Sequence, residues 1–117
     1  MLTENQQKWV DALRSDKYKQ GRFSLQSPTG FCCLGVACKV AEENGVHVEY
    51  CVNSINRLFG GCLASQPDVQ EWLQLKTATG KCTIGYLSSL NDSGSTFSEI
   101  ADIIEQNSES LFYQETE

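Results

Sequence analysis

The segment FCCLGVACKVAEENG, residues 31–45, is an apolar run that ends in a helix stop signal. Between Leu34 and Ala41 its apolar side chains recur at intervals of three and four residues, which predicts a helix with one apolar stripe. Asn44 and Gly45 are typical of a helix C-terminus. The small residues at positions 35, 37 and 41 allow another element to approach closely. We therefore expect this helix to be buried at the centre of the fold.

Two further helices are predicted from capping boxes, in which a Ser or Thr and a Gln or Glu three residues later bond to each other's backbone N–H. Thr3 and Gln6 precede apolar residues at helical spacing, which predicts a helix over about residues 4 to 14. Thr96 and Glu99 precede a second run of this kind. This run predicts the last helix of the chain.

Turn-forming residues separate the other elements. Ser65 and Pro67 predict the start of another helix. The turn at residues 27–30 predicts a hairpin over residues 18–32. The shorter elements we expect are a strand over residues 46–50, a strand at Cys82 and Ile84, and a loop over residues 91–94, while residues 51–62 are compatible with a short helix or an irregular segment.

These elements predict an α+β fold with about four helices packed on a small, mainly antiparallel sheet. A length of 117 residues supports one domain. We expect the globular domain to cover residues 1–105, followed by an acidic, frayed tail over residues 106–117. Leu111, Phe112 and Tyr113 could instead fold back onto the body or contact a partner.

The chain is acidic, with 9 Lys and Arg against 15 Asp and Glu and a formal charge of -6. Seven of the acidic residues and none of the basic ones lie within residues 92–117. Phosphate backbones would be repelled, so we expect no direct nucleic-acid binding. A basic partner would be attracted.

No segment has the length and apolarity of a membrane-spanning helix, and the first residues lack the pattern of an export signal. We therefore expect a cytoplasmic protein that binds no membrane. In a reducing compartment the six cysteines are expected to be thiols that pack as small apolar side chains, with a disulfide framework as the alternative.

Two motifs carry a resemblance to a known group of proteins. They are CCLGV at residues 32–36 and the pattern LNDxGxxFxEIA at residues 90–101. Together with Trp9 and Leu13 before them and Trp72 and Leu73 between them, these motifs resemble a family of small bacteriophage-encoded proteins met in phages of cyanobacteria and enterobacteria. The resemblance covers about residues 3 to 105 and is lost over residues 46–62. It implies a setting, the cytoplasm of an infected bacterium, and no particular reaction.

One candidate chemistry is a cysteine nucleophile. Cys32 or Cys33 lies near a predicted helix start, where a thiol pKa can be lowered. His47, the only histidine, would be the base, and Asn91 or Asp92 could orient it. The alternative is that both cysteines are core residues and His47 is an exposed strand residue.

Ligand binding is a second candidate. Asn91, Asp92, Ser95 and Thr96 precede the last helix, whose N-terminal N–H groups could hold an anion. The alternative is ordinary turn chemistry. His47 and Cys51 have a spacing seen in metal sites, but without a Cys-x-x-Cys pair we expect no metal and no cofactor.

These observations favour a non-enzymatic phage accessory protein. Its partner would be a host protein or a small molecule of the host's defence signalling. The alternative is a small thiol-dependent enzyme that uses Cys32 or Cys33 with His47.

Overall fold

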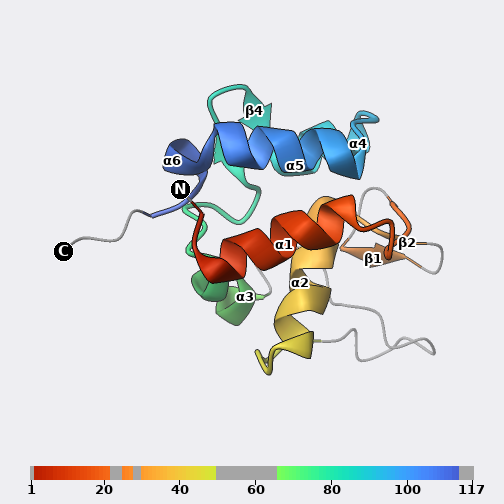
Figure 1. Cartoon of the computed structure of the whole chain (residues 1–117), viewed down its shortest axis with the longest axis vertical. Helices are drawn as coiled ribbons and strands as arrows, with labels where there is room; N and C mark the ends of the chain where they lie inside the picture. Colours follow the sequence, from red (N-terminus) through yellow and green to blue (C-terminus); the bar gives the residue numbers. More distant parts are fainter. Residues whose placement is uncertain (1, 22–24, 28–29, 50–65, 114–117) are drawn as a thin grey trace.

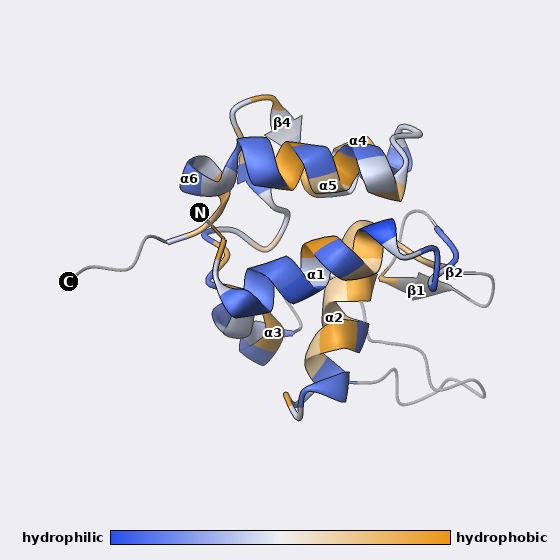
Figure 2. Cartoon of the chain, viewed as in Figure 1, coloured by the Kyte–Doolittle hydropathy of each residue, from blue (hydrophilic) through white to orange (hydrophobic). Residues whose placement is uncertain are grey.

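Helix α2 (Cys33–Glu43) lies at the centre of the fold, and every residue from Cys33 to Cys38 is buried. The computed structural model describes residues 2–21, 25–27, 30–49 and 66–113. Among the helices that the structure describes, Figure 2 shows α2 as the most continuously apolar one. The expected central helix is therefore confirmed.

Helix α1 (Glu4–Arg14) contacts both α2 and α5 (Phe97–Gln106), as Figure 1 shows. Both α1 and α5 begin with the capping boxes that the sequence predicted. The apolar face of α1 carries Trp9, whose ring meets Phe112 edge-on at 6.3 Å between centroids. The three helices thus enclose one core.

The described residues also form three shorter helices: α3 (Pro67–Leu73), α4 (Leu87–Asp92) and α6 (Ser108–Leu111). Two antiparallel hairpins accompany them. Strand β1 (Gln26–Ser27) pairs with β2 (Gly30–Phe31), and β3 (Lys81–Cys82) pairs with β4 (Gly85–Tyr86). The described residues therefore confirm an α+β fold with four main helices and small antiparallel sheets.

Gly35 explains why small residues are needed in α2. A Cβ atom at this position would lie 1.7 Å from the backbone oxygen of Leu25. Leu25 also accepts a hydrogen bond from the backbone N–H of Cys32 at 3.2 Å. The segment before the first hairpin thus crosses α2 in direct backbone contact.

The expected strand over residues 46–50 is wrong for residues 46–49, which form no strand, and residue 50 lies outside the described part. Instead, the side chain of Gln66 pairs with the backbone of Glu49. Its Oε1 accepts the Glu49 N–H and its Nε2 donates to the Glu49 carbonyl, both at 2.8 Å. A buried amide therefore takes the place of a neighbouring strand.

Two helix boundaries also differ from expectation. Residue Gln66, rather than Ser65, precedes α3, and Ser65 lies outside the described residues. Asn91 and Asp92 are not in a loop, because they form the last turn of α4. The turn follows them, at Gly94, whose φ of 111° favours glycine.

Both hairpins have short ladders within the described residues. Of the hairpin predicted over residues 18–32, the ladder pairs Gln26 with Phe31 and Ser27 with Gly30, Gln20 adds a parallel bridge to Phe31, and residues 22–24 and 28–29 lie outside the described part. Cys82 lies in β3, whereas Ile84 lies in the turn beyond it and is 59 % exposed.

The fold continues past residue 105, where a frayed tail was expected. Helix α6 follows α5, and both Leu111 and Phe112 are buried in the core. Phe112 forms an antiparallel bridge with Leu75. Residues 106–112 are therefore part of the domain, because their apolar side chains complete its core. No helix within the described ranges is long and apolar enough to cross a membrane.

Candidate functional site

The two sequence motifs meet at the side chain of Asn91, which is fully buried. Its Oδ1 accepts hydrogen bonds from the Cys33 N–H at 3.1 Å and from Gln20 Nε2 at 2.9 Å. Its Nδ2 donates to the Gly21 carbonyl at 2.9 Å and to Asp92 Oδ1 at 3.3 Å. The amide of Asn91 is thereby fully used in joining α4 to α2 and to the segment before the first hairpin.

The N-terminus of α2 is capped from within the chain. Cys32 is the N-cap, and its Sγ accepts the Gly35 N–H at 3.3 Å, the role that Ser or Asp more often plays. Asn91 Oδ1 accepts another N–H of the first helical turn, that of Cys33. These donors are therefore not available to an anionic ligand.

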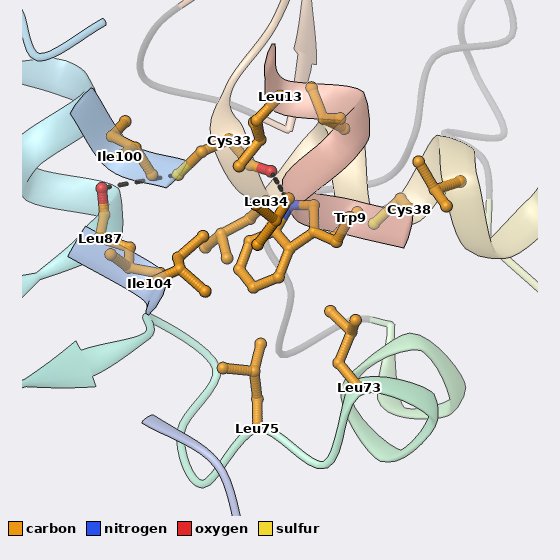
Figure 3. Packing of buried hydrophobic residues seen from close by; sticks show 14 of the residues in the cluster. Trp9, Leu13, Cys33, Leu34, Cys38, Leu73, Leu75, Leu87, Ile100 and Ile104 are labelled. Carbon is orange, nitrogen blue, oxygen red and sulfur yellow. Dashed lines mark hydrogen bonds between the residues drawn. The ribbon is translucent and has the colours of Figure 1, made fainter. Parts of the chain in front are cut away.

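The two adjacent thiols lie in surroundings that oppose ionisation. Cys33 is fully buried, and its Sγ lies 3.6 Å from the Leu87 carbonyl, to which it can donate (Figure 3). Burial raises the pKa of both the Cys32 and the Cys33 thiol, and the charge of Asp92 adds to the effect. Reactive thiols require the opposite shift.

His47 is not brought to these thiols. It lies beyond the C-terminal end of α2, whereas Cys32 and Cys33 lie at the N-terminal end, and an 11-residue helix is about 16 Å long. His47 is exposed, and the nearby Glu49 carboxylate, 2.9 Å from Nε2, raises the pKa of the imidazole. The candidate catalytic pair is therefore separated by the length of α2.

The expected ligand residues before α5 lie close together, but their polar groups form hydrogen bonds within the chain. The Thr96 hydroxyl accepts the Glu99 N–H at 3.1 Å, and Glu99 Oε1 accepts the Thr96 N–H at 3.0 Å. The Ser95 carbonyl accepts a bond from Gln20 at 2.7 Å. Because a carboxylate already caps this helix, an anion would be repelled there.

Of the two residues with metal-ligand spacing, His47 and Cys51, the second lies outside the described residues. Within residues 2–21, 25–27, 30–49 and 66–113, no three His, Cys, Asp or Glu side chains are grouped as metal ligands would be.

A different feature, which the sequence did not reveal, lies beside α3. A hollow of about 430 Å³ opens between α3, the start of α1 and the residues after α2. Asp68 and Glu71, both exposed, contribute carboxylates to it, and half-buried Trp72 contributes an aromatic wall. The remaining lining residues are Thr3, Asn5, Val46 and Gln74. We call this the acidic hollow.

Side chains of α1 hold α3 in place at this hollow. Gln6 is buried and donates to the Leu73 carbonyl at 2.8 Å. Asn5 donates to the Trp72 carbonyl at 3.3 Å. Because these carbonyls lack partners inside α3, the two bonds satisfy the end of the helix and fix its orientation.

A second hollow, of about 490 Å³, lies against the same helix and shares Glu71 and Gln74 with the first. Its other lining residues are Pro67, Gln70, Leu75 and Tyr113. We call this the Tyr113 hollow. Tyr113 is 61 % exposed and is held by a bond from its N–H to the Gln74 carbonyl at 2.8 Å.

Gln74, between the two hollows, departs from ordinary local structure twice. Its backbone is left-handed, with φ 60° and ψ 33°, at a helix end where glycine is usual. Its Oε1 is buried and has no hydrogen-bond partner. A sequence pattern could have found this residue only if the end of α3 had been located to the residue.

Comparison with known proteins gives a family but no activity. No curated protein and no solved structure matches the chain. A family model described as a domain of unknown function (DUF8296) matches residues 1–108, which include both motifs, α3 and the residues named for the acidic hollow, whereas Tyr113 lies beyond the match. The chain belongs to this family, DUF8296.

Proposed function

We propose that this chain is a non-enzymatic binding protein, a phage accessory protein that acts in the cytoplasm of an infected bacterium. Its partner would be a host protein or a small molecule of the host's defence signalling. The observation that carries binding over catalysis is the state of Cys32 and Cys33. Their pKa values are raised by burial, and His47 lies at the other end of α2. The phage setting is supported by the resemblance of the two sequence motifs.

The charge of the chain favours a basic partner. The formal charge of -6 steers cations towards the surface. Part of the acidic C-terminal region is neutralised within the fold, because Arg14 forms ion pairs with Asp102 and Glu105. By contrast, no lysine or arginine within the described ranges pairs with Asp68 or Glu71.

Affinity capture tests this proposal. The tagged chain is incubated with bacterial lysate, and retained proteins and heat-released small molecules are identified by mass spectrometry. The control bait is an unrelated protein of similar size and net charge. A stoichiometric species that is retained by this chain alone, and that rebinds after purification, is the expected result.

Iodoacetamide labelling tests the enzymatic alternative on the same sample. The expected result is that Cys32 and Cys33 stay unlabelled in the folded protein at pH 6 and react only after denaturation. Fast labelling of either thiol in the folded state, with no species captured, would overturn the binding proposal in favour of a thiol enzyme.

A further inference from the structure

We propose that the acidic hollow and the Tyr113 hollow together bind a basic segment of a partner protein. An arginine or lysine side chain would enter the acidic hollow, and a neighbouring apolar side chain would enter the Tyr113 hollow. This inference deepens the proposed function and rests on it for the existence of a protein partner. Its own support comes from the carboxylates of Asp68 and Glu71, from the Trp72 ring, and from the unpartnered Gln74 Oε1.

The lining of the acidic hollow has one sign of charge. Among the residues that the structure describes, Asp68 and Glu71 are the only ionisable ones in its lining, which there contains no Lys, Arg or His. Several other carboxylates of the described surface already pair with a lysine or arginine or cap a helix, namely Glu42, Glu43, Glu99, Asp102 and Glu105. Asp68 acts at longer range on the exposed His47, whose pKa its charge helps to raise, but neither Asp68 nor Glu71 forms an ion pair within the described ranges. Two such carboxylates at one hollow favour a cation from outside the chain.

Trp72 adds an aromatic surface of the kind that cations prefer. The other tryptophan, Trp9, is fully buried, and its indole N–H donates to the Cys33 carbonyl at 2.9 Å. Trp72 is only half-buried and lines the hollow beside the two carboxylates. A guanidinium or ammonium group against an indole face is attracted by the ring quadrupole. Carboxylate and indole therefore favour the same class of ligand.

Gln74 supplies an acceptor between the two hollows. Its Oε1 is buried and lacks a donor, and Gln74 lines both hollows. A guanidinium carries five N–H donors and can meet both a carboxylate and an amide oxygen. A glycine at this helix end would relieve the left-handed backbone and remove the unpaired oxygen. A left-handed backbone and an unpartnered buried oxygen at the same residue both cost stability, and such costs are characteristic of functional positions.

The Tyr113 hollow favours an apolar side chain as the second part of the ligand. Pro67, Leu75 and Tyr113 give it apolar surface, and Glu71 and Gln74 join it to the acidic hollow. A single extended segment with apolar and basic side chains next to each other would reach both hollows. The hollow of about 380 Å³ between α1 and α2 has no such preference, because Lys8 and Lys17 line it together with Asp11 and Glu43.

The test compares two peptides by NMR titration of the ¹⁵N-labelled full chain. The probe is acetyl-Leu-Arg-Leu-amide, and the control replaces arginine by citrulline, which has nearly the same shape and no charge. We expect the arginine peptide to cause saturable shifts at the Trp72 indole N–H and the backbone amides of residues 68–75, leaving the Trp9 indole unmoved. The citrulline peptide should bind about tenfold more weakly. Equal shifts with both peptides, or none with either, would overturn the proposal.

Variants separate binding from folding. Asp68→Asn with Glu71→Gln should weaken the arginine peptide about tenfold, while Asp11→Asn with Glu109→Gln, with the same change in net charge, should leave its affinity unchanged. Gln74→Gly should raise Tm and weaken the peptide. A purely structural Gln74 would change Tm alone, and that result would contradict its assigned role.

The remaining outcomes distinguish this inference from the proposed function. If free argininamide binds as tightly as the tripeptide, the site is one for small amines and the protein-segment proposal is wrong. If a partner captured from lysate binds the Asp68→Asn, Glu71→Gln variant as well as the wild type, the binding function stands and this site is wrong. If the tripeptide binds as described but no partner is captured, the site stands and the proposed function is wrong.

Discussion

The side chain of Asn91 accepts the backbone N–H of Cys33 at 3.1 Å, across 58 positions of sequence. This bond joins the motif at residues 32–36 to the motif at residues 90–101. A buried N–H at the first turn of a helix would otherwise lack a partner. The motifs are therefore explained in this structure as parts of one packing arrangement, and their presence does not require a catalytic site.

Replacing Asn91 should be among the most damaging single changes. In Asn91→Ala the buried Cys33 N–H and Gly21 carbonyl lose their partner, and we expect the free energy of unfolding to fall by about 2 to 4 kcal/mol. Urea denaturation measures the change. As a control, Asn107→Ala removes only a bond to the Ile103 carbonyl at the end of α5 and should cost about 1 kcal/mol. Equal losses in the two variants would contradict the central role of Asn91.

Gly35 should tolerate no side chain. A Cβ would lie 1.7 Å from the Leu25 oxygen, so Gly35→Ala must displace backbone, at a cost of about 3 kcal/mol or more. Gly45→Ala is the matched control, because Gly45 has a φ of 86° and open space around it. Its strain should cost about 1 kcal/mol. Comparable stability of the two variants in urea would show that Leu25 does not cross α2 so closely.

The buried thiols predict a loss of stability at alkaline pH. Burial raises the pKa of Cys32, Cys33 and Cys38 in the folded state, so the folded chain holds protons that the unfolded chain releases. The stabilisation is complete below the unfolded pKa, near 9, and is lost as pH rises above it. Each thiol contributes a slope of about 1.4 kcal/mol per pH unit.

Urea denaturation under reducing conditions from pH 7 to about pH 10 measures this slope. Cys38→Ala should give a shallower slope while lowering stability at pH 7. A stability that stays flat across the alkaline range would mean that the thiols are exposed.

The Arg14 ion pairs should contribute modestly. Arg14 bridges Asp102 and Glu105 of α5, but its side chain is 37 % exposed and the carboxylates are more exposed still. Arg14→Met should therefore cost about 1 kcal/mol or less. The difference should shrink at about 1 M salt, where the screening length is about 3 Å. Thermal denaturation at low and high salt measures both effects, and a salt-independent loss would point to packing of the arginine stem instead.

Much of the fold is predictable because its signals are local. The capping boxes at Thr3 and Thr96 and the apolar stripe of α2 are complete within a few residues, and each gave the right element. The strand expected after α2 failed because a distant side chain, Gln66, satisfies the Glu49 backbone. No local pattern reports a partner 17 residues away.

The site was harder to predict for a related reason. Asn91 and Asp92 carry turn chemistry in sequence, yet a helix and a set of long-range bonds absorb Asn91. The hollows beside α3 combine residues from both ends of the chain, such as Asn5 and Tyr113, with Gln74. That the two hollows share Glu71, and that the Gln74 Oε1 has no partner, becomes evident only once α1, α3 and the end of the described chain are packed together.

Capture from bacterial lysate with three baits in parallel tests whether the carboxylates of the acidic hollow bind a basic partner. They are the wild type, the Asp68→Asn, Glu71→Gln variant, and the charge-matched Asp11→Asn, Glu109→Gln variant. We expect the wild type and the charge-matched variant to retain a basic protein in stoichiometric amount, and the Asp68→Asn, Glu71→Gln variant to lose it. Retention of the same protein by all three baits, or by none, would contradict this prediction.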